Sequence, residues 1–366
     1  MIYKAIGLMS GSSLDGLDIA YTHYQQSGAA WTYEIVCADC FPYTGEWKQR
    51  LAGATALPAL DYCLLHTDFG RYLARQVNQF IDVNNLHHKV DLVASHGHTT
   101  FHDPARHMTA QLGDGAAVAA GTGLSVVSDL RAMDVALGGQ GAPIVPIGEK
   151  FLLPGYRWLL NLGGIANLSA RTGDALIAFD VCPANRVLNL LVAPLGKEYD
   201  EDGQLAATGR VHTGLLEALN QLDYYCQPYP KSLANEFGTG VVYPLVSKYG
   251  LPVQDALRTY VAHLCSQIRL AVQETDRETA PLNGSRQLLV TGGGALNGFV
   301  IAELRSALGA LGIEVVVPEQ KLVLYKEAVI MGLIGVLRWR EEVNVLASVT
   351  GARNDSIGGA LWLGDV

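Results

Sequence analysis

The stretch Gly11-Ser12-Ser13-Leu14-Asp15-Gly16-Leu17-Asp18 says most about how this chain folds. An apolar run over residues 2–9 precedes it and is typical of a buried strand, and residues 17–24 partly alternate apolar and polar side chains, as in a second strand. A glycine and serine turn between two strands presents N–H groups and hydroxyls with little bulk, which suits close approach to phosphate oxygens. Asp15 and Asp18 could then hold a metal ion or orient a water molecule beside those phosphates. A tight hairpin with two solvated carboxylates is the alternative that this stretch alone leaves open.

The composition describes a folded, acidic chain. Its 366 residues are long enough for two domains, and with 49% hydrophobic and 17% charged residues it can bury large cores. A net charge of −9 disfavours nonspecific nucleic-acid binding, which requires a basic face. Neither a long apolar run nor a signal-peptide pattern is present, so we expect no membrane partner and a cytoplasmic protein. The six scattered cysteines are expected to be reduced structural thiols.

Strands and helices alternate along most of the sequence, which predicts an α/β fold with a mostly buried sheet. Residues 90–94 and 124–128 are typical of buried strands, while residues 62–83 and 257–272 have helical apolar spacing. The strand predicted for residues 90–94 ends at Ser95 and the one for residues 124–128 ends at Asp129, so polar side chains follow both.

The arrangement of strand, glycine turn and strand occurs again later in the chain. The apolar run 157–162 is followed by Gly163 and Gly164 and then by a second predicted strand over residues 168–171. A third predicted strand, residues 175–179, ends at Asp180. Another glycine turn, residues 292–294, separates an apolar strand from a predicted helix. Its spacing to the next glycine misses the dinucleotide pattern by one residue, so NAD binding is not expected. Two similar halves with facing glycine turns would form a nucleotide cleft between domains.

With these turns and strand ends in place, the chain resembles the anhydro-N-acetylmuramic acid kinase family. The resemblance implies an actin/hexokinase/Hsp70-type ATPase fold with two lobes, duplicated ribonuclease H-like domains and a central cleft for nucleotide and sugar. We expect a first lobe of residues 1–131 plus 348–366 and a second of residues 132–347. The matching motifs follow the family's order nearly from end to end: residues 7–18, 95–99, 111–114, 129–134, 138–143, 161–167, 179–185, 292–294, 326–328 and 350–353.

The family's reaction opens the internal ether bridge of 1,6-anhydro-N-acetylmuramic acid with water and phosphorylates oxygen 6. The resemblance therefore implies a phosphotransferase with an alcohol acceptor that uses ATP and Mg2+, acts in peptidoglycan recycling and forms a homodimer. A levoglucosan kinase, which acts on a different 1,6-anhydro sugar, is the alternative within the same fold.

The resemblance also implies roles for individual residues. Asp180 matches the catalytic base; from local sequence alone it could instead cap a helix or sit in a turn. Sugar contacts are implied for Ser95, His96, Asp129, Arg131, Asp134 and Glu327. The positions that match nucleotide-binding motifs, each otherwise an ordinary turn residue, are Gly11, Ser12, Ser13, Leu14, Asp15, Gly16, Leu17, Asp18, Gly163, Gly164, Gly292, Gly293 and Gly294.

Two interpretations of Arg131 stay open. Its guanidinium could form a bidentate pair with the lactyl carboxylate that distinguishes a muramic acid. It could equally form an interior ion pair with Asp129 or Asp134.

The chain departs from the family pattern at several positions. Ser12 stands where the family usually has Thr, and His98 where it usually has Gln. Residues 181–185 read Val-Cys-Pro-Ala-Asn in place of Thr-Gly-Pro-Gly-Asn, and Asn189 occupies an acidic position. These changes bear mainly on substrate choice.

Two functions of other classes compete with the kinase. His96 and His98 after a strand could belong to a zinc-dependent hydrolase, because an H-x-H pair begins many metal sites. A non-catalytic, nucleotide-switched protein of the actin/Hsp70 kind would keep the phosphate turns without a sugar pocket.

Overall fold

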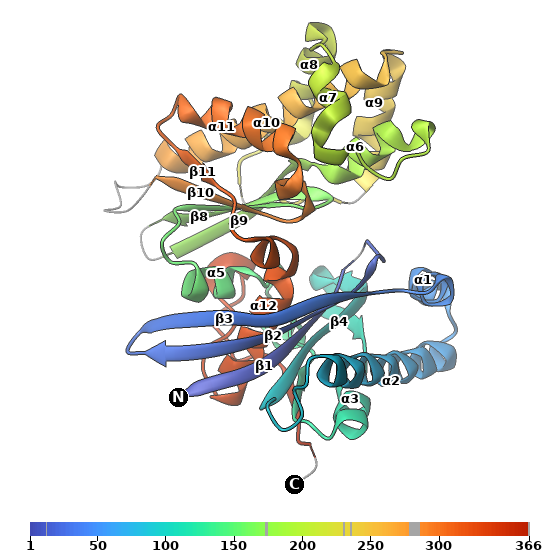
Figure 1. Cartoon of the computed structure of the whole chain (residues 1–366), viewed down its shortest axis with the longest axis vertical. Coiled ribbons are helices and arrows are strands. Elements are labelled where there is room, and N and C mark those ends of the chain that lie inside the picture. Colours follow the sequence, from blue (N-terminus) through green and yellow to red (C-terminus); the bar gives the residue numbers. More distant parts are fainter. Residues whose placement is uncertain (12, 173–174, 230, 235, 278–285, 365–366) are drawn as a thin grey trace. The chain divides into compact units, whose positions relative to one another are not determined.

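The computed structural model describes residues 1–11, 13–172, 175–229, 231–234, 236–277 and 286–364 (Figure 1). Ser12 of the first glycine turn therefore lies outside the described residues. Contacts within the chain divide it into two compact units: Met1–Leu153 with Tyr325–Val366, and Pro154–Leu324.

The first unit is built on a seven-stranded sheet. Its strand order is β12-β6-β4-β1-β2-β3, with β5 paired to β4. The strands are β1 (Ile2–Ser10), β2 (Gly16–Ser27), β3 (Ala30–Pro42), β4 (Leu92–Asp103), β5 (Met108–Leu112), β6 (Val126–Ser128) and β12 (Ala360–Trp362). The helices are α1 (Gly45–Ala52), η1 (Ala54–Ala56), α2 (Ala59–Val83), η2 (Pro104–Arg106), α3 (Gly115–Thr122), α4 (Ala132–Ala136), α5 (Pro146–Leu152), α12 (Gln320–Trp339) and α13 (Ala347–Thr350).

One core of this unit lies between the sheet and α2, where Phe69, Leu73 and Val77 pack with Ile6 and Leu8 of β1. From Tyr325 onward α12 also packs against the sheet. It is apolar on nearly every side, as expected of a central buried helix. The Tyr24 hydroxyl of β2 donates to the carbonyl oxygen of Val329 in α12 (2.5 Å).

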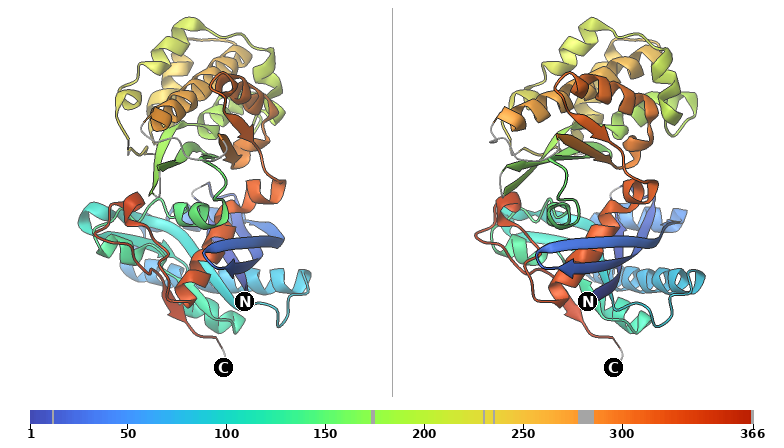
Figure 2. Two further views of the ribbon diagram at one scale, coloured as in Figure 1. Left: turned by 90° about the vertical axis from the view of Figure 1, so that its left-hand side faces the viewer. Right: turned by 60° about the vertical axis from the view of Figure 1, so that its left-hand side comes forward.

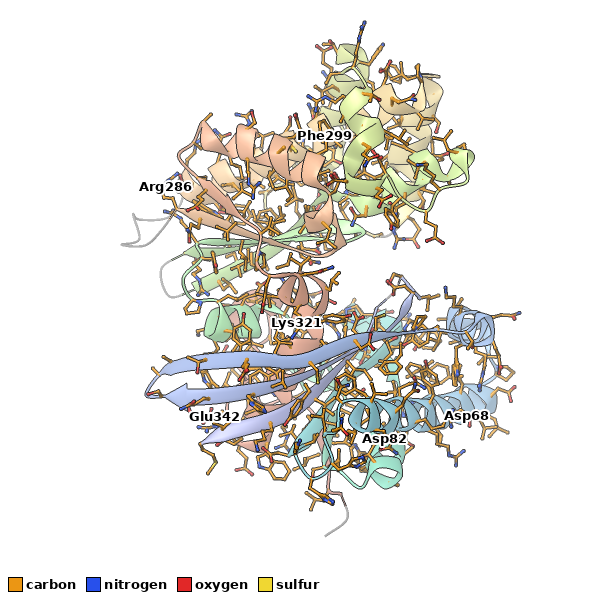
Figure 3. All side chains as sticks on the ribbon, in the orientation of Figure 1. Asp68, Asp82, Arg286, Phe299, Lys321 and Glu342 are labelled. Atoms are coloured by element: carbon orange, nitrogen blue, oxygen red, sulfur yellow. The ribbon has the colours of Figure 1, made fainter. Side chains whose placement is uncertain are left out.

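The second unit has a five-stranded sheet in the order β11-β10-β7-β8-β9. Its helices gather on one face of that sheet (Figures 1 and 2), and side chains fill the layer between them (Figure 3). The strands are β7 (Trp158–Leu162), β8 (Ile165–Thr172), β9 (Ala175–Pro183), β10 (Gln287–Thr291) and β11 (Glu314–Val316). The helices are α6 (Asn185–Val192), η3 (Ala193–Leu195), η4 (Glu201–Gly203), α7 (Gln204–Thr208), α8 (Thr213–Asn220), η5 (Asp223–Cys226), η6 (Phe237–Val242), α9 (Tyr243–Lys248), α10 (Val253–Arg277), η7 (Gly293–Leu296) and α11 (Gly298–Gly309).

The two sheets repeat one strand topology. In the first unit β1 pairs antiparallel with β2, β2 antiparallel with β3, β1 parallel with β4, and β4 parallel with β6. In the second unit β7, β8, β9, β10 and β11 pair in the same order and the same directions. This is the ribonuclease H-like order in duplicate, and it confirms the predicted two-part α/β fold of actin-like ATPases.

The contacts place the unit boundaries elsewhere than expected. Residues 132–153 and 325–347, which we expected in the second lobe, are grouped with the first unit. The close approach of α12 to β1 explains the second of these ranges, because the helix backbone packs directly on Gly7. Among the described residues, none of the helices combines the length and the apolar character that crossing a bilayer requires.

Gly7 is required by this helix-on-strand contact, which gives a first prediction. A Cβ at Gly7 would overlap the carbonyl oxygen of Ala328 and lie 2.7 Å from the backbone nitrogen of Gly332. We expect Gly7→Ala to lower the free energy of unfolding by about 2–3 kcal/mol, the usual cost of overpacking a core. Urea denaturation measures it.

Gly45→Ala is the matched control, because a Cβ at Gly45 meets nothing within 4 Å. Equal stability of the two variants would contradict the proposed packing of α12 on β1.

Candidate functional site

The predicted site residues of the first unit lie at one edge of its sheet. Because β1, β4 and β6 are parallel, their carboxyl ends meet at the same edge. Ser10 at the end of β1 pairs with His98 of β4, and Val127 near the end of β6 pairs with Ala94. The first glycine turn, residues 95–98 and Asp129 are therefore brought together at this edge.

The turn after β1 is held by its own side chains. The Ser13 hydroxyl donates to Asp15 Oδ1 (2.6 Å), and the backbone N–H of Gly16 donates to the same oxygen (3.0 Å). Leu14 adopts a left-handed conformation with φ of 57°. A Cβ at Gly16 would lie 2.7 Å from Cys40 Sγ and from the carbonyl oxygen of Phe41, so glycine is required where β2 begins against β3.

The acidic side chains beside this turn suit a cation. Burial raises the pKa of Asp18 to about 6; the Cys40 thiol opposes this shift, and the charges of Asp15 and Glu327 add to it. A divalent cation would relieve this repulsion, and carboxylate oxygens are the ligands that Mg2+ prefers. Within the described part of the chain no group of three or more His, Cys, Asp or Glu side chains is arranged to hold a metal ion. Asp15 and Asp18 thus fit Mg2+ when phosphate oxygens supply further ligands.

Strand β4 is irregular where it carries the predicted sugar residues. Leu8 pairs with Ser95 and Ser10 with His98, so β4 contains one residue more than β1 over this span. Gly97 has φ of 70°, and the buried Ser95 hydroxyl accepts a hydrogen bond from its backbone N–H (3.2 Å). Such bulges commonly redirect side chains near functional sites.

His96 is buried, neutral and fully hydrogen-bonded. Its Nδ1 bonds the carbonyl oxygen of Gly97 (2.8 Å), and its Nε2 accepts from Arg131 Nε (2.9 Å). Burial, with the nearby Arg131 charge, lowers the pKa of His96 to about 3. His98 Nδ1 is bonded to the Ser10 hydroxyl (3.0 Å). These bonds occupy both ring nitrogens of His96 and Nδ1 of His98, and the described residues contain no group of three or more potential metal ligands, so the geometry gives the zinc-hydrolase alternative no support.

Arg131 does not form the interior ion pair that the sequence left open. None of the ion pairs among the described residues includes its guanidinium, although the charges of Glu327 and Asp134 act on it at longer range, and its Nη1 donates to the carbonyl oxygen of Gly141. Asp134 instead accepts from the backbone N–H of Gly141 (2.7 Å) and the hydroxyl of Thr350 (2.6 Å). Asp129 accepts from a neighbouring serine hydroxyl (2.8 Å). Burial lowers the pKa of Arg131 to about 10.

Glu327 is presented by α12 next to a buried ion pair. Lys326 Nζ lies 2.8 Å from Glu149 Oε1, and both side chains are buried. The Glu327 carboxylate itself makes no hydrogen bond within the described residues, and burial raises its pKa. Its charge acts on both Asp18 and Arg131, raising the pKa of each.

In the second unit the two predicted glycine turns lie against each other. A Cβ at Gly292, where φ is 81°, would lie 2.7 Å from Asn161 Oδ1, and one at Gly294 would lie 2.7 Å from the Leu162 side chain. The Asn185 backbone N–H donates to the carbonyl oxygen of Gly163 (3.0 Å). The ends of β7 and β10 and the start of α6 therefore form one surface of glycines and backbone groups at the sheet edge. Gly164 and Gly293 belong to the same two turns.

Asp180 lies on β9 at this same edge. Asn167 Nδ2 donates to its Oδ1, and the backbone N–H of Leu233 donates to its Oδ2 (2.7 Å). Burial raises the pKa of Asp180, and these two hydrogen bonds oppose the shift. Asp180 does not cap a helix, because α6 begins at Asn185 with Ala184 as its N-cap.

Several residues that support the site could not be predicted from the sequence. Asn167 belongs to a recognised motif, but only the register of β8 and β9 shows that it faces Asp180. Leu233 contributes a backbone group and has no sequence signal. The pairing of Lys326 with Glu149 joins residues far apart in the chain.

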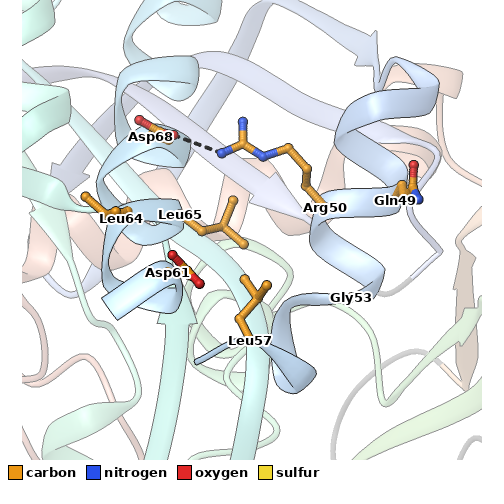
Figure 4. Close-up of a pocket in the computed structure, with 8 residues that line it drawn as sticks. All are labelled: Gln49, Arg50, Gly53, Leu57, Asp61, Leu64, Leu65 and Asp68. Carbon is orange, nitrogen blue, oxygen red and sulfur yellow. Dashed lines mark hydrogen bonds and ion pairs between the residues drawn. The ribbon is translucent and has the colours of Figure 1, made fainter. Parts of the chain in front are cut away.

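A surface pocket of about 300 Å3 lies beside α1 and α2 (Figure 4) and contains none of the predicted site residues. The ion pair between Arg50 and Asp68 (2.9 Å) borders it. Its lining residues are Gln49, Arg50, Gly53, Leu57, Asp61, Leu64, Leu65 and Asp68.

A family model and the similar curated proteins point to the same family. A family model described as anhydro-N-acetylmuramic acid kinase matches residues 3–364. The anhydro-N-acetylmuramic acid kinase of Paramagnetospirillum magneticum is 35% identical over 84% of each chain. That of Gloeobacter violaceus is 34% identical over 99% of this chain and 98% of its own.

Solved structures are more distant. The activator of 2-hydroxyisocaproyl-CoA dehydratase from Clostridium difficile has a TM-score of 0.42 and 14% identity, covering 92% of this chain and 97% of its own. The match over residues 3–364 and the identities above 30% show that the chain belongs to the anhydro-N-acetylmuramic acid kinase family, a family of sugar kinases.

Proposed function

We propose that this chain uses ATP and water to convert 1,6-anhydro-N-acetylmuramic acid into N-acetylmuramic acid 6-phosphate. Membership of the family supports the kinase activity and the sugar. The observation that carries the mechanism is the Asp180 carboxylate, which two N–H donors hold at the sheet edge that also carries the glycine turns. Nothing in the structure favours a levoglucosan kinase or a nucleotide switch.

In the substrate, oxygen 6 is bound to carbon 1 and is not a free hydroxyl. Asp180 accepts a proton from water as the water oxygen bonds to carbon 1 and the bond between carbon 1 and oxygen 6 breaks. The released electron pair on oxygen 6 forms a bond to the γ-phosphorus of ATP, and ADP departs with the electrons of the broken phosphoanhydride bond. The proton on Asp180 then returns to solvent. Burial favours this role because it moves the pKa of Asp180 upward, toward working pH.

The glycine turns supply the nucleotide contacts in this proposal. Residues 11–18 and the turn at Gly163 and Gly164 would donate backbone N–H groups to the phosphates, while residues 292–294 leave room for adenosine. Mg2+ held by Asp15 and Asp18 would neutralise charge on the phosphates when bound.

The sugar contacts are assigned to the edge of the first unit. Arg131 is our candidate for the lactyl carboxylate, since its guanidinium has no carboxylate partner and its Nη2 makes no hydrogen bond among the described residues. Ser95, Asp129 and Glu327 offer hydroxyl and carboxylate groups to sugar hydroxyls. His96 has both ring nitrogens hydrogen-bonded and Asp134 accepts from Gly141 and Thr350, so we assign them to holding Arg131 and Gly141 in place beside the sugar.

The cellular setting follows from the family alone. We propose a cytoplasmic homodimer that acts in the recycling of peptidoglycan fragments.

Asp180→Asn tests the assignment of the base. The amide cannot accept the water proton, so we expect kcat to fall by roughly 1,000-fold, within the usual contribution of general base catalysis. ADP release measures kcat, and KM for both substrates should be retained. The control is Asp223→Asn, which alters an exposed aspartate of the same unit. Native turnover by a folded Asp180→Asn protein would refute the assignment.

Arg131→Ala tests the contact with the lactyl group. We expect KM for the muramic acid substrate to rise about 100-fold, since a charge-assisted pair is lost. Any activity on levoglucosan, which has no carboxylate, should be unaffected. Arg106→Ala, at an exposed arginine, is the matched control. Equal losses on both sugars would exclude the carboxylate contact.

A further inference from the structure

We propose that Asn167 is a positioning residue for Asp180, forming with the backbone N–H of Leu233 a two-donor clamp on its carboxylate. This inference rests on the proposed function, in which Asp180 is the base. The clamp would fix the plane of the carboxylate and leave one lone pair of each oxygen free to accept a proton.

The register of the second sheet creates this clamp. Asn167 on β8 pairs directly with Asp180 on β9, whereas Ala166 pairs with Cys182, so Val181 is an extra residue in β9. Directly paired residues of antiparallel strands point to the same face of the sheet. The bulge thus places the Asn167 amide against the carboxylate, where Nδ2 donates to Oδ1.

The second half of the clamp comes from residues 231–233. The backbone N–H of Leu233 donates to Asp180 Oδ2 (2.7 Å), and the carbonyl oxygen of Lys231 accepts from the backbone N–H of Asp180 (3.0 Å). The Tyr224 hydroxyl donates to the carbonyl oxygen of Asp180 (2.6 Å). Lys231 Nζ donates to the carbonyl oxygen of Tyr224 (3.3 Å), which ties the two parts of this segment together.

The ionised Asp180 carboxylate depends on the clamp, because no charged side chain nearby in the described part of the chain stabilises it. Burial, together with the Asp180 charge, raises the pKa values of the neighbouring Tyr224 and Cys182, so both stay protonated and place no charge beside the carboxylate. Lys231 directs its ammonium to backbone carbonyl oxygens at Tyr224 and Gln227. With no cation paired to the carboxylate among the described residues, the two N–H donors are what stabilise its ionised form.

The test is the acid limb of the pH dependence of kcat/KM, on which activity is lost as Asp180 gains a proton. Asn167→Ala removes a donor to the carboxylate, so its pKa should rise and the limb should move upward by about 1 pH unit. Asn167→Asp places a like charge there and should move the limb further. Both changes shift the limb, whereas a residue needed only for folding would lower activity equally at every pH.

Tyr224→Phe is the matched control, because it removes a hydrogen bond to the Asp180 main chain and none to its carboxylate. Its acid limb should stay at the wild-type position. Thermal melting of each variant verifies folding. An unmoved limb in both folded Asn167 variants would overturn the clamp.

Asp180→Asn separates this inference from the proposed function. If Asp180→Asn is inactive while the Asn167 variants keep the wild-type limb, the clamp fails and the base assignment stands. If Asp180→Asn is fully active, the proposed function itself fails.

Discussion

The parallel pairing of β1 with β4 in the first unit, and of β7 with β10 in the second, is the constraint on which the candidate residues of each unit depend. Parallel strands end at a common edge, so whatever follows each strand is brought together there. In the first unit that edge carries the turn after Ser10, the polar residues of β4 and the end of β6. In the second it carries the two glycine turns and, since β9 runs in the same direction as β7, also Asp180.

Bulges in two strands of these sheets then set the direction of the candidate site side chains. The extra residue in β4 lies next to His96 and His98, and the extra residue in β9 lies next to Asp180. Glycine supports both edges for a steric reason, because a side chain at Gly16 or Gly292 would collide with a neighbouring strand. Repetition of one topology thus yields two sheet edges of different chemistry. The edge of the first unit carries the Arg131 guanidinium and several carboxylates, and the edge of the second carries the hydrogen-bonded Asp180 carboxylate beside glycine turns.

Much of the fold could be predicted from periodicity. The strand, turn and strand around residues 2–24 correspond to β1 and β2, and the helical spacing of residues 62–83 and 257–272 lies within α2 and α10. Strand β4 continues beyond its predicted end at Ser95, because its outer part pairs with β5. The partners of the site residues could not be predicted, since Asp180 and Leu233 are 53 positions apart and meet only in the folded chain. Nor could the sequence predict whether Arg131 forms an ion pair, because this depends on the hydrogen bonds that Asp129 and Asp134 accept from other groups.

The central claim is that one carboxylate directs water to carbon 1 so that oxygen 6 becomes the phosphoryl acceptor. A single turnover in water enriched with heavy oxygen tests it directly, with mass analysis of the product against a sample of unlabelled product held in the same water for the same time. The account predicts one heavy oxygen at carbon 1 beyond that exchange control, and none in the bond between oxygen 6 and phosphorus. Heavy oxygen in the phosphate ester, or an unlabelled carbon 1 oxygen, would contradict it.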